Sequence, residues 1–335
     1  MIKSLQSLRF FFALMIFLHH SALNLLVFGA FPVSFFFILS GFVLMMGYGD
    51  RISSMSYGDF TLKRILRVYP THILCLFIAL FVSAIISYPI DWYNTLPSFF
   101  LIQAWIPLQE IYFAGNSVAW YVSDIVFCYL MFPLLVKVMK WNPSVSIVIV
   151  VICYLIGCFL IPSEYHHAFL YINPFFRVVD FMIGMWLCLI LQQDFWIKVK
   201  DKMLKLGGWG KTLCESVPII ISFIAILISI KYENAFSYAV LWWVPSLVII
   251  IIYSSLDSSP GLVLKLLQLK PLIVLGSISY AFYMLHRSIL MVNNYLMNIT
   301  PINYVLDGLI VLIVLIVLSY IVTYYFEPLF KKRRK

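Results

Sequence analysis

Arg9 and His20 stand eleven residues apart in the first apolar segment of the chain, and their side chains suit anion binding and proton transfer. On an α-helix, eleven residues turn through about 1100° and rise by about 16 Å, so the two side chains share one stripe. An ionisable group inside a membrane-spanning helix is a functional candidate by default. The pair predicts a binding site in which Arg9 binds an anion near one interface and His20 transfers protons near mid-bilayer.

The neighbouring imidazole, His19, would point about 80° away from Arg9 around the same helix. We expect it to pack against a neighbouring helix or to orient His20. For His20 itself the alternative to catalysis is a hydrogen bond between helices, the usual structural use of a membrane histidine.

A second basic group lies in the segment 63–70, which reads KRILRVYP. Arg64 and Arg67 are three residues apart and would share one helical face. Planar guanidinium groups bind phosphate in bidentate fashion, so the two could hold a phosphorylated ligand from the cytosol, with Arg9 as a third cation. Alternatively, they are an interfacial cluster that orients the next helix. Pro70 is expected at the entry to that helix.

The elements that carry these residues must span a membrane, because 63% of the 335 residues are hydrophobic, 18% are aromatic and 11% are charged. This composition excludes a soluble globule and predicts an all-α, polytopic transmembrane bundle. Residues 1–330 are expected to form one membrane domain, with 331–335 as a basic cytoplasmic tail. About ten segments are long enough to cross the bilayer, at roughly 6–27, 31–48, 69–88, 118–139, 144–162, 172–192, 214–231, 236–254, 270–291 and 303–326.

The formal net charge of +9 reflects topology and predicts no nucleic-acid partner. Basic residues fall almost entirely in alternate loops, so the positive-inside rule predicts that both termini lie in the cytoplasm. The terminal basic run would anchor the last helix against anionic lipid. The first segment begins like a signal peptide, but it has no small-residue cleavage site and should remain as a helix.

The six cysteines are expected to fill apolar space, because all of them lie in apolar segments without the spacing of metal ligands. No metal is predicted.

Further polar residues are expected towards the external side. Arg177 and Asp180, three residues apart, predict a structural ion pair. His286 would bind an acceptor or stabilise the bundle, with Tyr280 on a nearby face. Asp124 and Trp120 would join Trp92, Tyr93, Trp105 and Tyr112 in an aromatic and polar surface suited to sugars, although aromatic residues also line the interfaces of every membrane protein.

Seven fragments, in this order, resemble the bacterial membrane-bound acyltransferase 3 family, which includes O-antigen and exopolysaccharide O-acetyltransferases. The resemblance covers almost the whole chain. The fragments are Ser7-Leu8-Arg9 followed by His20, SFFFILSGF at 34–42, RILRVYP at 64–70, WYVSD at 120–124, RVVDF at 177–181 with Gly184, LGSISY at 275–280 with Tyr283 and His286, and Glu327-Pro328. Ser40 and Gly41, in the second fragment, are assigned structural roles.

The resemblance implies transfer of an acyl group, usually acetyl from acetyl-CoA, to a hydroxyl of a cell-envelope glycan such as O-antigen or its lipid-linked precursor. It implies that Arg9 and His20 are essential and that Arg64 and Arg67 form the CoA-side motif. Asp124 departs from the family pattern, since many members have Glu there. The predicted partners of the protein are acetyl-CoA, a glycan or lipid-linked glycan acceptor, and membrane lipids.

The chemistry of acetyl-CoA agrees with this placement of charges. Its polyanionic nucleotide cannot enter lipid and would stay among Arg64, Arg67 and Arg9, while the pantetheine arm reaches inward by about the 16 Å that separates Arg9 from His20. There the imidazole could act as a general base on the acceptor hydroxyl or could itself accept the acetyl group. The sequence leaves both mechanisms open.

Two other functions fit parts of the pattern. A transporter or flippase for a lipid-linked glycan could use the same buried Arg and His, although broken helices and symmetric halves are not apparent. A polysaccharide polymerase should have its arginines in external loops, where this chain lacks them.

Overall fold

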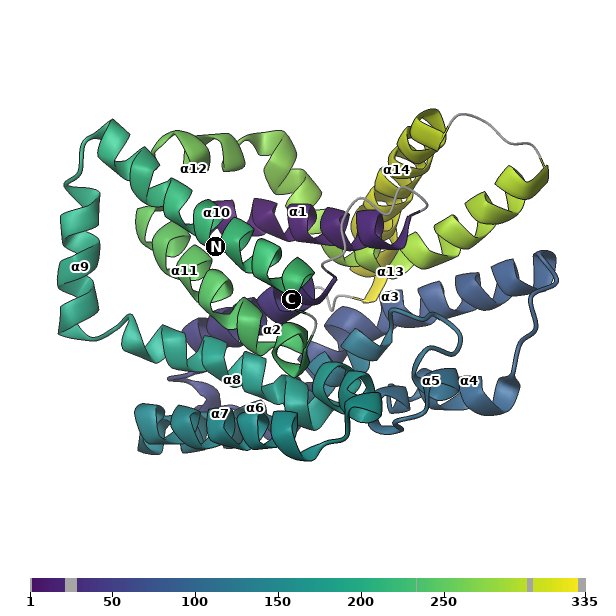
Figure 1. The fold of residues 1–335 in the computed structure, drawn as a ribbon, viewed down its shortest axis with the longest axis horizontal. Helices are drawn as coiled ribbons and strands as arrows, with labels where there is room; N and C mark the ends of the chain where they lie inside the picture. Colours follow the sequence, from purple (N-terminus) through teal and green to yellow (C-terminus); the bar gives the residue numbers. More distant parts are fainter. Residues whose placement is uncertain (1, 22–28, 233, 300–303, 331–335) are drawn as a thin grey trace.

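The computed structural model describes residues 2–21, 29–232, 234–299 and 304–330, and this part of the chain is helical throughout, as predicted (Figure 1). Eight helices are long and apolar enough to cross a membrane, or nine if one bent pair counts as a span. The protein is therefore a multi-pass membrane protein. The eight spans are built on α2 (Ala30–Tyr48), α3 (Tyr57–Ile85), α6 (Trp120–Trp141), α7 (Pro143–Leu160), α10 (Gly208–Lys231), α11 (Val240–Leu256), α13 (Lys270–Ile299) and α14 (Tyr304–Ile321).

The bent pair forms the sixth predicted span. A short 3-10 helix and the π-helix His167–Ile172 precede α8 (Pro174–Ile190), and the two parts meet at 50°. Asn173 accepts a hydrogen bond from the backbone N–H of Phe175 and so caps α8. Pro174 starts the helix, where its missing N–H costs nothing.

The first predicted span becomes α1 (Lys3–His20). It is not among the eight or nine candidates, because Arg9 and the two histidines make it more polar than the others. The helix ends at His20, so the boundary predicted at residue 27 is too late, and residues 22–27 lie outside the described residues, as do residue 303 and the tail 331–335. His20 therefore sits at a helix end.

The prediction for Pro70 is wrong. The helix α3 begins at Tyr57 and runs through the proline, so Arg64 and Arg67 lie on a helix and not in a loop before one. An internal proline removes one backbone hydrogen bond. Tertiary packing outweighs that loss, because Phe60 in the first turns is buried and stacks on Phe132 with ring centroids 5.4 Å apart.

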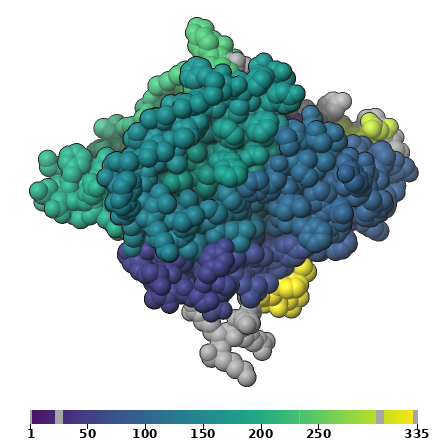
Figure 2. Space-filling view, turned by 90° about the horizontal axis from the view of Figure 1, so that it is seen from below, coloured from purple at the N-terminus to yellow at the C-terminus, as the bar shows by residue number. Residues whose placement is uncertain are grey.

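Shorter helices connect the spans. Between α3 and α6 lie α4 (Trp92–Phe99), a 3-10 helix at Gln103–Trp105 and α5 (Gln109–Tyr112), and this segment lies beside the end of α3 in Figure 1. In Figure 2 it forms one face together with the teal segments that follow it. At the other end of the bundle, α9 (Asp194–Leu204) stands at the left edge of Figure 1 and links the end of α8 to the start of α10, and α12 (Leu262–Leu267) precedes α13.

Glycine allows α2 and α8 to touch backbone to backbone. A Cβ atom at Gly41 would lie 1.9 Å from the carbonyl oxygen of Phe181, and one at Gly184 would lie 1.9 Å from that of Ile38. Any side chain at either position would force the helices apart. This crossing gives Gly41 the structural position that the sequence predicted.

The N-terminus of α1 is held by a carboxylate from the α11–α12 connection. Asp257 accepts hydrogen bonds from the backbone N–H groups of Lys3 and Ser4, at 3.1 and 3.0 Å, and from the Ser4 hydroxyl at 2.7 Å. Burial disfavours the charged carboxylate, but these bonds and one from Gln268 outweigh it and lower the pKa of Asp257. The negative charge also complements the helix dipole.

Candidate active site

The helix α1 packs directly against α13. A Cβ atom at Gly276 would lie 2.0 Å from the carbonyl oxygen of Gln6, so only glycine allows this approach. Further along, the ring of Phe282 packs edge-on against Phe10 and Phe17, with centroids 5.2 and 6.0 Å apart. The two helices run in the same direction from the glycine contact, and this register brings their later histidines together.

His20 and His286 form a hydrogen-bonded pair. Nδ1 of His20 lies 3.0 Å from Nε2 of His286, and the rings stack with centroids 5.1 Å apart. The other nitrogen of His286, Nδ1, lies 2.5 Å from the carbonyl oxygen of Tyr283. The sequence left the role of His286 open; the structure makes it the direct partner of His20.

These contacts fix the tautomers of both neutral rings. A carbonyl oxygen only accepts, so Nδ1 of His286 carries the hydrogen and Nε2 of His286 must be an acceptor. Nδ1 of His20 then donates to it, which leaves the lone pair of His20 on Nε2. The arrangement prepares Nε2 of His20 to take up a proton or to attack an electrophile.

A segment before α6 is fastened to α13 around this pair. The hydroxyl of Tyr283 donates to the carbonyl of Val118, at 2.8 Å, and the side-chain amide of Asn116 donates to the carbonyl of Met284, at 2.9 Å. Arg287, next to His286, donates to the Ser117 hydroxyl at 3.2 Å. The residues 116–118 thereby form one wall beside the histidines.

His19 does not share the orientation of His20. Its ring lies against Gly29, where an added Cβ would come within 3.0 Å of the imidazole, and it is tilted by 58° from the ring of His20. The prediction that His19 packs against a neighbouring element agrees with this position.

The three predicted donor-site arginines gather around one tyrosine. Tyr129, on α6, interacts electrostatically with Arg67, Arg64 and Arg9. Arg9 interacts in turn with Arg67 and with the carboxylate of Glu327. Arg64 is half-buried and Arg67 exposed, so the cluster reaches solvent.

Tyr48, at the end of α2, enlarges this cluster. The guanidinium carbons of Arg51 and Arg64 lie 4.4 and 4.3 Å from the centroid of its ring, which is cation–π geometry. Four arginines thus collect at one level of the bundle. Like charges at this density repel each other, and a bound polyanion would relieve that repulsion.

Tyrosines connect the arginine cluster to the histidine pair. Tyr121 interacts with Ser40 and with the charge of Arg9, and its ring lies 5.6 Å from that of Tyr283. The ring of Tyr283 lies 5.7 Å from that of His286. The sequence motifs contained both tyrosines but gave no reason to choose them, because only the crossing of α6 and α13 brings them between the two charged groups.

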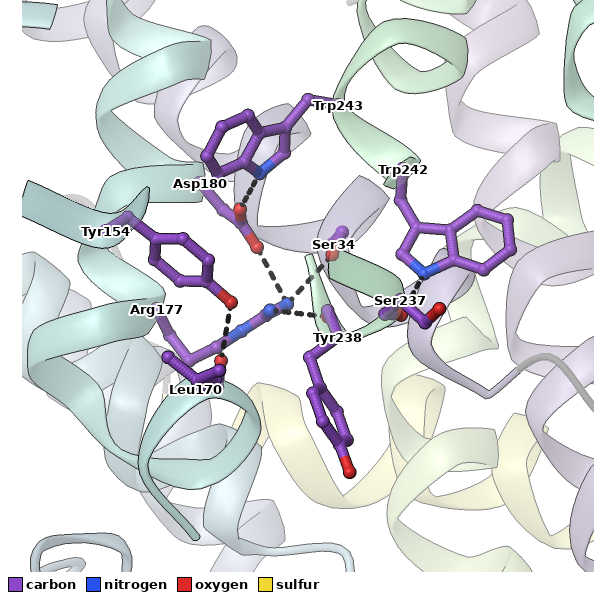
Figure 3. A network of polar contacts seen from close by, with 9 residues as sticks. All are labelled: Ser34, Tyr154, Leu170, Arg177, Asp180, Ser237, Tyr238, Trp242 and Trp243. Atoms are coloured by element: carbon purple, nitrogen blue, oxygen red, sulfur yellow. Dashed lines mark hydrogen bonds and ion pairs between the residues drawn. The ribbon is translucent and has the colours of Figure 1, made fainter. Parts of the chain in front are cut away.

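Arg177 and Asp180 form an ion pair of 2.8 Å between side chains with no solvent exposure (Figure 3). Arg177 also donates to the Ser34 hydroxyl and to the carbonyl of Tyr238, at 3.1 and 3.2 Å, while the indole of Trp243 donates to Asp180. The network ties α2, α8 and α11 together. Within the described ranges, no three His, Cys, Asp or Glu side chains are grouped as metal ligands would be.

The predicted external surface is wrong for several residues. Asp124 has no exposed surface and neither carboxylate oxygen has a hydrogen-bond partner, while Trp120 and Tyr112 are 5% and 4% exposed. The reason is that the preceding segment covers the start of α6, where Ser123 donates to the carbonyl of Leu101 at 2.6 Å. Only Trp92 and Tyr93 are largely exposed.

Tyr280 also differs from its expected position. Its hydroxyl donates to the carbonyl of Val68 on α3, at 2.8 Å, and it interacts with Glu327 and Tyr129. Tyr280 therefore lies beside the arginine cluster, between α13 and α3.

The fold defines a multi-pass membrane protein with a cluster of arginines at one level of the bundle and a pair of histidines at another. The family model for an acyltransferase domain matches residues 2–326, so the chain belongs to the acyltransferase 3 family and is an acyltransferase. The chain is also similar to the acyltransferase MdmB of Streptomyces mycarofaciens, with 26% identity over an alignment 335 positions long that covers 89% of this chain and 81% of that protein. No solved structure gives a significant match.

Proposed function

We propose that this protein is an O-acetyltransferase of the bacterial inner membrane. It transfers the acetyl group of acetyl-CoA to a hydroxyl of a cell-surface polysaccharide such as O-antigen, or of its lipid-linked precursor. The observation that carries this proposal is that one helix, α1, holds a member of the arginine cluster and, about 16 Å along its axis, an imidazole with a defined lone pair.

The donor binds from the cytosol in this proposal. The distribution of basic residues in alternate loops favours a cytoplasmic position for both termini and the arginine cluster. Arg64, Arg67 and Arg9 hold the phosphates, and Tyr48 keeps Arg64 in place. The thin arm of the donor then extends along α1 towards His20.

At the histidine pair, Nε2 of His20 removes the proton from the acceptor hydroxyl while its oxygen attacks the thioester carbonyl. The C–S bond then breaks, and the proton passes from His20 to the leaving thiolate. His286 stabilises the transient imidazolium by accepting from Nδ1 of His20. General-base catalysis of this kind contributes about 10²–10⁴-fold to a rate.

Purified full-length protein in proteoliposomes tests the proposal. Acetyl-CoA is supplied on the cytoplasmic face with a deacetylated surface polysaccharide, and release of CoA is followed together with mass spectrometry of the glycan. We expect stoichiometric release of CoA and a gain of acetyl units on the glycan. Movement of a lipid-linked glycan without any covalent change would instead identify a flippase.

A further inference from the structure

A cluster of aromatic rings and one histidine converges near the external end of α6. His167 lies against Tyr112, Phe113, Tyr171 and Tyr238, with ring centroids 5.9, 6.0, 5.3 and 6.0 Å away. We call these five residues the aromatic cluster. They come from three separate segments, and Figure 2 shows the blue segment that contains Phe113 beside the teal segment that contains His167.

Four of the five side chains are partly buried and keep some exposed surface: Phe113, His167, Tyr171 and Tyr238. Trp120 is buried and packs on Tyr171, with ring centroids 4.9 Å apart. Ligand sites in proteins are typically lined by aromatic side chains with a few well-placed polar groups.

The segments that present the cluster are anchored by the buried network of Figure 3. Arg177 donates a hydrogen bond to the backbone carbonyl of Tyr238, and the Trp242 indole donates one to the carbonyl of Ser237 at 2.6 Å. The hydroxyl of Tyr154 donates a hydrogen bond to the carbonyl of Leu170, within the π-helix, at 3.1 Å. The ring of Tyr238 points away from Arg177 (Figure 3). Short π-helices are rare and frequently lie at functional sites.

The cluster also has a defined polar group. The hydroxyl of Tyr112 lies 3.2 Å from Nδ1 of His167. Burial and the charge of Glu110 raise the pKa of Tyr112. The imidazole of His167 and the hydroxyl of Tyr112 are the polar groups that the cluster offers to a ligand hydroxyl.

The cluster is connected to the histidine pair. Tyr171 interacts electrostatically with Tyr283, whose carbonyl accepts from His286, and His286 accepts from His20. A ligand on the cluster would therefore lie next to the wall of residues 116–118 that flanks the proposed base.

We infer that the aromatic cluster binds the pyranose ring of the sugar acceptor, an assignment that rests on the proposed function for its place in the reaction. The apolar face of the sugar lies against Tyr171, Tyr238 and Phe113. The imidazole of His167 forms a hydrogen bond with a ring hydroxyl. Both contacts are remote from the donor-site arginines, so the cluster sets acceptor affinity alone.

Saturation-transfer NMR on the full-length protein in detergent tests this site without requiring catalysis. The probes are methyl glycosides of rhamnose, galactose, mannose and glucose, with cyclohexanol as a ring that has one hydroxyl. We expect saturation transfer to at least one glycoside and a loss of at least tenfold in Tyr238→Ala and in Phe113→Ala. Tyr238→Phe should retain binding, because it keeps the ring face and the carbonyl that Arg177 holds.

Tyr93→Ala is the matched control, since Tyr93 is 84% exposed and lies outside the cluster. Size-exclusion profiles confirm folding, and the two alanine variants lie on different segments, so one of them suffices if the other misfolds. Transfer that is unchanged in the cluster variants, or equal for cyclohexanol, overturns the inference. Glycoside binding without release of CoA from acetyl-CoA would contradict the proposed function but would still support the sugar-binding site.

Discussion

Two groups of arginines in this protein have opposite surroundings. Arg177 is fully buried, is paired with Asp180, and has hydrogen bonds to Ser34 and to a backbone carbonyl. Arg9, Arg64 and Arg67 instead gather with Arg51 around tyrosines, and Glu327 is the carboxylate that interacts with Arg9. A matched arginine stabilises the fold, whereas an excess of positive charge at one level is available for an anion.

The same contrast separates the two ends of α1. Its first turn is capped by the carboxylate of Asp257, while its last residue, His20, pairs through Nδ1 with the imidazole of His286. One end is fixed by charge, and the other carries an imidazole whose lone pair lies on Nε2. The following predictions test this division, beginning with the largest effect.

Replacement of His20 should nearly abolish acyl transfer. We expect His20→Ala to lower kcat by about 10²–10⁴-fold, the usual contribution of a general base, with a normal amount of membrane-inserted protein. His19→Ala, the matched control, should retain at least partial activity because His19 packs on Gly29. Full activity in His20→Ala, measured as CoA release, would remove the central step of the mechanism.

Arg177→Met should destabilise the fold rather than the chemistry. An unpaired buried carboxylate costs about 3–5 kcal/mol, so we expect a large fall in the thermal unfolding midpoint. Lys140→Met is the control, because it breaks the ion pair between Lys140 and Asp50, whose side chains are 41% and 95% exposed. An exposed pair contributes about 0–1 kcal/mol. Equal thermal unfolding midpoints for the two variants would contradict the structural role of the buried Arg177–Asp180 pair.

His286 should act by positioning His20. His286→Phe keeps a buried ring but accepts no hydrogen bond, and we expect kcat to fall by about 10–100-fold while KM for acetyl-CoA stays unchanged. His286→Gln retains an acceptor oxygen and should recover part of that loss. If His286→Phe has the kcat of the wild type, the tautomer of His20 is fixed in another way.

Arg64→Lys together with Arg67→Lys keeps both charges but removes the planar fork. We expect KM for acetyl-CoA to rise about tenfold, with kcat preserved if the thioester is still placed correctly. Added salt should weaken donor binding further. Lys63→Met removes a charge from the same turn of α3 and should leave KM unchanged. An unaltered KM in the double variant would make these arginines a topology anchor only.

The smallest effect concerns Asp257. Its folded-state pKa lies below the ordinary value, so its stabilisation is present above about pH 4 and is lost as pH falls through the folded pKa. We expect Asp257→Asn to cost about 1 kcal/mol at pH 7 and to differ less from the wild type at pH 3. Asp59→Asn, exposed in the first turn of α3, is the control. A constant difference between pH 7 and pH 3 would exclude this role for the Asp257 charge.

Much of the bundle followed from hydropathy, because each predicted span coincides with a helix in the described residues. The exceptions have local causes. Helix α1 ends seven residues early at its histidines, and α3 starts twelve residues early because Phe60 packs on Phe132. Hydropathy registers the apolar interior of a span, but it does not register polar helix ends or the packing that extends a helix past Pro70.

The candidate site was predicted in part. Spacing alone placed Arg9 and His20 on one stripe and Arg64 and Arg67 on one face, because both relations lie within a single helix. The partnership of His20 with His286 was not predictable, since 266 residues separate them and only the contact at Gly276 sets the register. The exposure expected for Asp124 and Trp120 was wrong because the segment 86–119 folds over them.

The sequence by itself determined that this is an all-helical membrane protein with cations at one level of α1 and an imidazole at another, since these properties depend on composition and on helical spacing. Only the tertiary structure decided which charges are neutralised, which tautomer His20 adopts and which aromatic rings gather around His167. Those properties depend on contacts between distant helices, where a shift of one residue in register would change every partner.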